Sequence, residues 1–196
     1  MNAPSDWLGL ARASLLSPRA AARVLLGLRL PLRRLWELMA LVSVLTVLML
    51  WVEAQVADPQ TAALMTMILD RPILAAAVQF GLLLVTALAL LGIGNMFGGK
   101  GDWPGALALV VWIQALMLAL DVVQAVLYLV APTLGEIAGL AGLALQAWLL
   151  THFAAELHGF TNLWLVFFGL VISAILVGLG FATLMMLIGA PFLGVA

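Results

Sequence analysis

GGKGDWPGALALVVWIQALMLALDVVQAVLYLVA, residues 98–131, is the stretch that decides the fold. It begins as a glycine-rich polar turn and continues from Ala106 to Val130 as an apolar run. As a helix, that run is long enough to cross the roughly 30 Å hydrocarbon core of a bilayer. It also contains Asp121, the one acid that lies far from both ends of an apolar run. The stretch therefore predicts a membrane-spanning helix with a carboxyl group inside it.

The composition of the whole chain indicates a membrane protein. Of its 196 residues, 66% are hydrophobic and 9% are charged, and the mean hydropathy is +1.23. A soluble domain carries about 25% charged residues, so this chain has too little polar surface to cover a soluble fold. It has no cysteine, which excludes disulfides, thiolate catalysis and cysteine metal sites. The expected class is an all-α polytopic membrane protein.

Five apolar runs of spanning length follow one another, separated by proline, glycine and charged residues. Residues 61–69, between the first two runs, are too few to cross and predict a short helix at the membrane surface. The leader before the first run is too long for a cleaved signal peptide, so that run is expected to remain as an anchor. The expected organisation is a basic leader, residues 1–34, and a five-helix transmembrane domain, residues 35–196, with spans at about 35–57, 72–95, 106–130, 137–157 and 162–188.

The leader holds six of the eight basic residues of the chain. Ser17 and Pro18 are typical of a helix start, and a helix from there to Leu30 would be amphipathic. Its apolar face would hold Ala21, Val24, Leu25 and Leu28, opposite Arg19 and Arg23. We expect this N-terminal helix to lie in the headgroup plane as an interfacial amphipathic helix; the alternative is packing on the protein's own loops.

The basic side chains also predict partners and orientation. Anionic lipid headgroups are the expected partners, and nucleic acid is not expected. The residues assigned to headgroups are Arg19, Arg23, Arg29, Arg33, Arg34 and Lys100. With the N-terminus inside, the inner segments hold the six leader arginines and Lys100, and the outer segments hold Arg71 alone. The expected location is a bacterial inner membrane, with a cytoplasmic N-terminus and, after five spans, a periplasmic C-terminus.

Asp121 belongs to a polar stripe on its helix. The stripe consists of Gln114, Asp121, Gln124 and Tyr128, at positions i, i+7, i+10 and i+14. An acid inside a span is costly and by default marks a functional site. Three interpretations stay open: a hydrogen bond to Gln79, Gln146 or a neighbouring backbone, a contact to another protein chain, and a proton or ion path. We favour the hydrogen bond between helices.

A second candidate contact surface opens the fourth apolar run. Small residues recur there at helical spacing, which lets two helix backbones approach closely. This expected helix-packing face consists of Gly135, Ala138, Gly139 and Gly142.

Two motifs that suggest ligands are incomplete. Residues 94–101, GNMFGGKG, fit the phosphate-loop pattern GxxxxGK[ST] until Gly101 replaces the hydroxyl residue, and they follow a membrane helix, so we do not expect nucleotide binding. His152 and Glu156 at i, i+4, with His158 beyond, could hold a metal. We expect them instead to form a polar end to the fourth span. No catalytic residue, cofactor or metal is expected.

Three segments carry a resemblance to a known family. They are SPRAAARVLLGLRLPLRRLWELMALVSVL at 17–45, GGKGDWPGALALVVW at 98–112 and HFAAELHGFTNLWLVFFGLVISAIL at 152–176. With five spans, the chain resembles the Yip1 domain family in its bacterial branch, over about Pro18 to Ile188. Eukaryotic members of the family are membrane proteins of the secretory pathway that bind small GTPases and help shape or sort membranes, and the resemblance implies no catalytic residue for this chain. This chain lacks their long acidic leader, so GTPase binding is not carried over.

The expected function is that of a non-enzymatic integral membrane protein, a scaffold or accessory subunit that works through helix–helix contacts. Its expected protein partners are other membrane subunits or a second copy of the chain. The alternative function is a small transporter or a proton- or ion-conducting protein that uses Asp121.

Overall fold

The computed structural model describes residues 6–189, which form helices and no strand. The all-α class and the five long apolar helices are confirmed. Most predicted span ends lie within three residues of the observed ends. The fourth helix begins five residues earlier, at Pro132, because proline is well suited to the first helical position. The helices are α1 Trp7–Leu16, α2 Pro18–Gly27, α3 Leu32–Val56, α4 Pro59–Leu69, α5 Pro72–Met96, α6 Trp103–Val130, α7 Pro132–His158 and α8 Leu163–Gly189.

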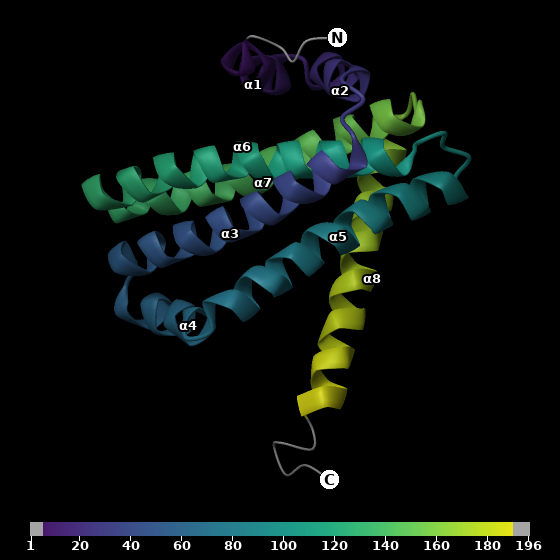
Figure 1. Cartoon of the computed structure of the whole chain (residues 1–196). Coiled ribbons are helices and arrows are strands. Elements are labelled where there is room, and N and C mark those ends of the chain that lie inside the picture. The colour runs from purple at the N-terminus through teal and green to yellow at the C-terminus, as the bar shows by residue number, and fades with distance from the viewer. Residues whose placement is uncertain (1–5, 190–196) are drawn as a thin grey trace.

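Four of the long helices form an up-and-down bundle (Figure 1). Helix α3 packs between α5 and α6, and α6 packs between α3 and α7. We call the end where α3 and α6 begin the basic end, and the end where they finish the far end. Helix α8 starts at the basic end, contacts α7 and α5, and then leaves the bundle at a steep angle (Figure 1).

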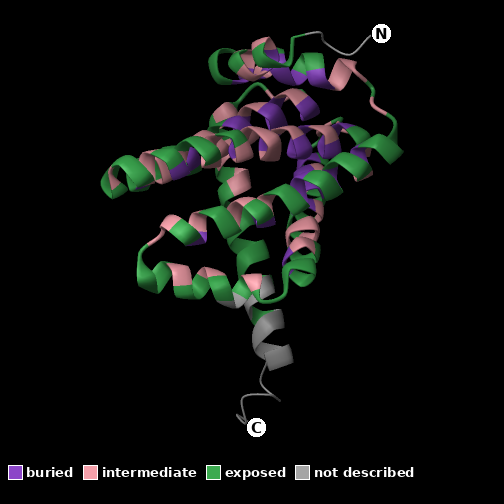
Figure 2. Ribbon diagram, turned by 60° about the vertical axis from the view of Figure 1, so that its left-hand side comes forward, coloured by how far each residue is buried: buried purple, intermediate pink, exposed green. Residues whose placement is uncertain are grey.

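The buried core lies in the half of the bundle nearest the basic end (Figure 2). Phe153, Leu107 and Leu109 are fully buried there, next to Leu35 and Met39 of α3. Large apolar side chains elsewhere face outward, as a lipid-facing surface requires. Because lipid tails are as apolar as these side chains, close packing and polar contacts must hold the helices together.

The N-terminal region contains one helix more than the sequence predicts. Helix α1 is capped by Asp6, whose carboxylate accepts a hydrogen bond from the Gly9 N–H at 2.6 Å. It is fixed to α6 by the Trp112 indole N–H, which donates to the buried Ser14 hydroxyl at 2.9 Å, and by a tilted contact between the rings of Trp7 and Trp112. Such a short helix is marginal alone, so its stability depends on these distant contacts.

Helix α2 begins as predicted, with Ser17 at the N-cap and Pro18 at the first position. Its buried residues Ala21, Ala22 and Leu25 pack on α7 and α6 of the same chain. Val24 was predicted on that face but is exposed. Ala22 is buried in its place, and the two alanines of this face allow α2 to approach α7 closely.

Candidate functional site

Two polar regions occupy opposite ends of the bundle, and the first is centred on His158. This histidine ends α7 and is buried, with 3% of its surface exposed. The Gly101 N–H donates to Nδ1 at 3.2 Å, so Nδ1 is unprotonated. The proton is therefore on Nε2, which donates to the Leu90 carbonyl at 3.0 Å. The ring is neutral and links α5, α7 and the turn before α6.

Glycines surround the His158 ring. A Cβ atom at Gly94, Gly99 or Gly101 would collide with the imidazole, so these three positions form a slot that only glycine leaves open. The backbone N–H of Lys100 also donates to the His158 carbonyl, at 3.4 Å. The glycine pattern that resembled a phosphate loop thus encloses a side chain of the same protein.

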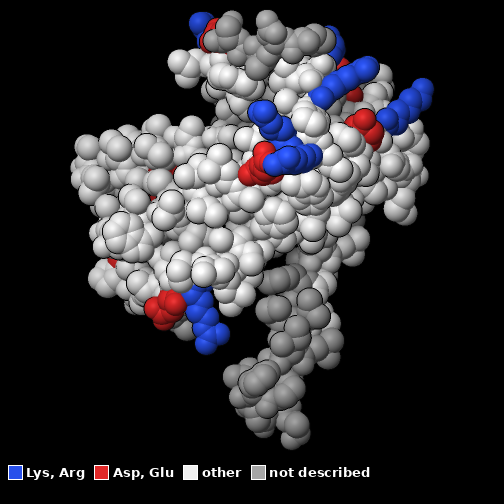
Figure 3. All heavy atoms as spheres, in the orientation of Figure 1, with Lys and Arg blue, Asp and Glu red and all other residues white. Residues whose placement is uncertain are grey.

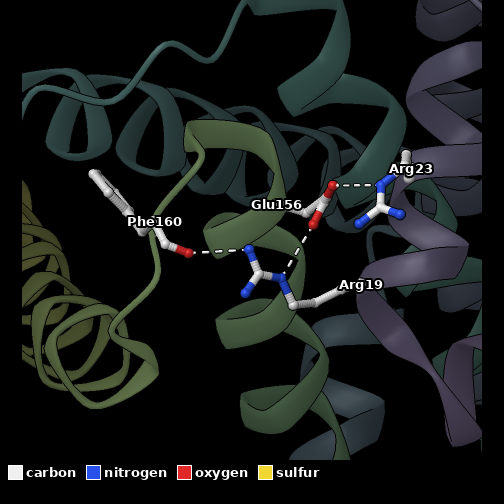
Figure 4. Close-up of polar contacts among 4 residues, drawn as sticks. All are labelled: Arg19, Arg23, Glu156 and Phe160. Atoms are coloured by element: carbon white, nitrogen blue, oxygen red, sulfur yellow. Dashed lines mark hydrogen bonds and ion pairs between the residues drawn. The ribbon is translucent and has the colours of Figure 1, made fainter.

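Glu156 connects α7 to the leader, as Figure 4 shows. Its carboxylate accepts from Arg19 Nε at 3.1 Å and from Arg23 Nε at 2.9 Å. Arg19 also donates to the Phe160 carbonyl at 3.0 Å. The Glu156 side chain is only 14% exposed, whereas that of Arg23 is 71% exposed. The hydrogen bond that Arg23 donates to Glu156, and then the charge of Glu156, raise the pKa of Arg23 above its usual value. This ion-paired group clamps α2 onto α7.

The three residues considered for a metal site point to different partners. His152 forms a contact from Nδ1 to the Trp148 carbonyl at 2.8 Å, Glu156 binds arginines, and His158 lies in its glycine slot. Across residues 6–189 no group of three or more His, Asp or Glu side chains could hold a metal ion. The arrangement is that of a structural connection between helices.

The second polar region lies toward the far end, where the stripe on α6 faces α3 and α7. Gln114 donates from Nε2 to Thr46 Oγ1 at 3.0 Å. Gly139 lies against the amide of Gln124, and Gly135 lies against the ring of Tyr128. Of the predicted packing face, Gly142 meets Leu120 of α6, and Ala138 is half-buried. The small residues of α7 and the stripe of α6 are therefore brought together.

Asp121 lies between two hollows. The first, the α6–α7 hollow, has a volume of about 630 Å³ and includes Glu136 and Gln146 in its lining. The second, the α3–α5 hollow, has a volume of about 680 Å³ and includes Glu53 and Gln79. The predicted partners Gln79 and Gln146 thus lie on opposite sides of Asp121. In the described chain, the Asp121 carboxyl receives no hydrogen bond.

An acid that shares a hollow with Asp121 was not recognised from the sequence. Glu53 of α3 lines the α3–α5 hollow together with Asp121 of α6. Its position near the end of α3 suggested a different depth from that of Asp121. The packing of α3 against α6 brings the two carboxyl groups together, which sequence spacing alone does not show.

Charged side chains are otherwise confined to the edges of the molecule. On the face shown in Figure 3 most of them gather at the basic end and near the turn between α4 and α5, and apart from small acidic spots toward the far end the surface between these places is uncharged. Five helices are long and apolar enough to cross a membrane. The fold and this charge distribution define a polytopic α-helical membrane protein.

Comparison with protein families agrees with this class. The family model described as Yip1 domain matches residues 12–185, and the chain belongs to that family. No curated protein and no solved structure matches the chain.

Proposed function

We propose that this Yip1-family protein is a non-enzymatic scaffold or accessory subunit that binds other membrane proteins, or a second copy of itself, through its transmembrane helices. The observation that carries the proposal is the α6–α7 hollow, where Asp121, Gln124 and Gln146 line an open space within the membrane-spanning region. Polar groups left facing hydrocarbon are costly. A partner helix that donates a hydrogen bond to Asp121 would remove that cost and fill the space.

The proposed orientation places the basic end at the cytoplasmic face of a bacterial inner membrane. The leader arginines and Lys100 lie at that end, and Arg71 lies at the other. This distribution follows the positive-inside rule and puts the C-terminus in the periplasm. A reporter fused after Ala196 should give a periplasmic signal, and a cytoplasmic signal would contradict this orientation.

The leader also has a proposed role in binding anionic lipid. Arg19 and Arg23 are held by Glu156, and Arg33 is paired with Glu37, so this role falls mainly to Arg29 and Lys100, while Arg34 contributes only diffuse attraction. Basic residues next to a membrane surface attract anionic headgroups. The membrane contact would supplement the protein contact at the far end.

Purification of the intact protein from its native membrane in mild detergent tests the subunit proposal. We expect a defined complex larger than the monomer. Asp121→Leu should reduce recovery of that complex about tenfold, since losing a hydrogen bond to a charged group costs roughly 1.5 kcal/mol. Val122→Leu, at an exposed position next to it, is the matched control and should leave the complex intact. A wild-type protein that is monomeric throughout would refute the proposal.

A second candidate function is proton or ion conduction. Glu53 and Asp121 line the same hollow, and Asp121 also lines a second one, which favours this function. Acids that line a common hollow within the membrane-spanning region are a typical feature of a proton relay. In proteoliposomes, Asp121→Asn and Glu53→Gln should each abolish the flux while leaving any complex intact. Wild-type vesicles without flux would exclude this function.

A further inference from the structure

A pocket at the basic end is distinct from both hollows beside Asp121. Its volume is about 560 Å³, and it lies between the end of α2, the start of α6 and the last turn of α7. One part of its wall is charged, with Arg29, Lys100 and Asp102. The other part is apolar and includes Leu26 and Leu157. Its volume is in the range of ordinary ligand sites, about 300–1,000 Å³.

The two basic residues of this pocket have no acid bound to them. The salt bridges among residues 6–189 involve Arg19, Arg23 and Arg33, and neither Arg29 nor Lys100 has a carboxylate oxygen within 4.0 Å. The third charged residue, Asp102, accepts a hydrogen bond from the Gly105 N–H at 2.9 Å and caps α6. Two cations and one anion leave the pocket with one net positive charge.

The backbone holds both basic residues at the pocket. Lys100 is fixed by the hydrogen bond from its N–H to the His158 carbonyl, and the next N–H binds the His158 ring. Arg29 has φ 43°, a conformation that a residue other than glycine rarely adopts. Such a conformation persists only where the surrounding structure enforces it, and it is common at ligand-binding positions.

The position of the pocket determines which anion fits. It lies where α6 begins and α7 ends, which is the boundary between headgroups and hydrocarbon for helices of this length. A phosphate in water would contact only the charged wall. A lipid would place its phosphate on the charged wall and its glycerol and upper acyl chain on the apolar wall.

We infer that this pocket is a binding site for an anionic glycerophospholipid, with the phosphate held by Arg29 and Lys100 and the upper acyl chain packed on Leu26 and Leu157. The inference deepens the lipid contact proposed above by assigning it to a built site. It rests on the proposed membrane location but is independent of the subunit contact, because the two sites lie at opposite ends of the bundle.

Native mass spectrometry of the intact protein, titrated with phosphatidylglycerol in mild detergent, tests this site. The variant Arg29→Gly with Lys100→Ala removes both charges, and glycine adopts the backbone conformation of Arg29 freely. We expect this pair to weaken the first binding event about 30-fold, since each juxtamembrane basic residue contributes about fivefold. The control pair Arg33→Ala with Arg34→Ala removes the same charge from exposed positions and should weaken it less than about threefold.

Three outcomes would overturn the inference. The control pair could weaken binding as much as the pocket pair, which would indicate diffuse attraction to the leader. Phosphatidylcholine could bind as tightly as phosphatidylglycerol, or soluble glycerol phosphate could displace the lipid at equal concentration. A further variant, Ala108→Phe, fills the pocket without changing its charge and should also weaken lipid binding. An unchanged helical circular dichroism spectrum shows that each variant is folded.

Discussion

Gly94→Ala should destabilise the protein because the new Cβ would collide with the His158 ring. Overpacking of this kind costs about 1–3 kcal/mol. The better helix propensity of alanine offsets up to about 1 kcal/mol of it, since Gly94 lies within α5. The expected net loss in the free energy of unfolding is therefore about 1–2 kcal/mol.

The same substitution should behave differently once the ring is removed. His158→Ala leaves the Leu90 carbonyl and the Gly101 N–H without their side-chain partner and opens a cavity, at a cost of about 3–5 kcal/mol. In that background the Cβ at position 94 enters vacated space, so Gly94→Ala should be neutral or stabilising by up to about 1 kcal/mol. The coupling energy between the two substitutions is then about 2 kcal/mol.

Unfolding of the purified protein by SDS in mixed micelles, followed by circular dichroism, measures all four members of this cycle. Gly92→Ala is the matched control, because it lies in the same helix with open space around its Cβ position. It should be neutral or slightly stabilising in both backgrounds. Additivity of Gly94→Ala and His158→Ala within about 0.5 kcal/mol would refute the histidine slot, as would an equal loss in Gly92→Ala.

Three further substitutions test the contacts around the bundle. Glu156→Gln removes the charge that holds α2, so the rate of hydrogen exchange in α2 should rise about tenfold. High salt should have the same effect on the wild-type protein. An unchanged exchange rate would contradict the ion-paired contact between α2 and α7. Trp112→Phe removes the hydrogen bond to Ser14 and should release α1 at a cost of about 1 kcal/mol, visible as faster exchange in α1 alone. Hydrogen bonds from Thr61, side chain first, lower the pKa of Asp58, so its contribution to α4 is present above its unfolded pKa and is lost as pH falls through its folded pKa. Asp58→Ala should remove this acid-range loss of α4 protection, and a persisting loss would assign it to another group.

The helices of spanning length could be predicted from the sequence because hydrophobic length is a local property of the chain. Helix α1 could not be predicted in this way, since its sequence has few residues typical of a helix start or end. It is held by a hydrogen bond between Ser14 and Trp112, which are 98 positions apart. Asp6 at its N-cap was the one available signal. The burial of Ala22 in place of Val24 was missed for a related reason: periodicity identifies an apolar face, but the packing of α2 on α7 decides which of its side chains are buried.

The candidate sites also depend on contacts between residues far apart in the sequence, which local patterns do not reveal. The spacing of the glycines in residues 94–101 was visible, but the reason for it is His158, which lies 57 positions beyond Gly101. The stripe containing Asp121 was visible from helical periodicity. Its relation to Glu53 depends on how α3 packs against α6, which periodicity does not encode.

The two ends of the bundle differ in how far their polar groups are satisfied, and this difference bears on function. At the basic end, Glu156 and His158 have partners within the chain and lie beside the buried core. Because no hydrophobic driving force brings helices together in lipid, these polar contacts fix α2, α5 and α7 relative to one another. At the far end, Asp121 lies between two hollows and draws no hydrogen bond from the described chain. The proposed partner would supply the polar contacts that Asp121 lacks, and it would do so without disturbing the end that holds the fold. Substitutions at Asp121 should therefore change association more than stability, and substitutions at His158 should do the reverse.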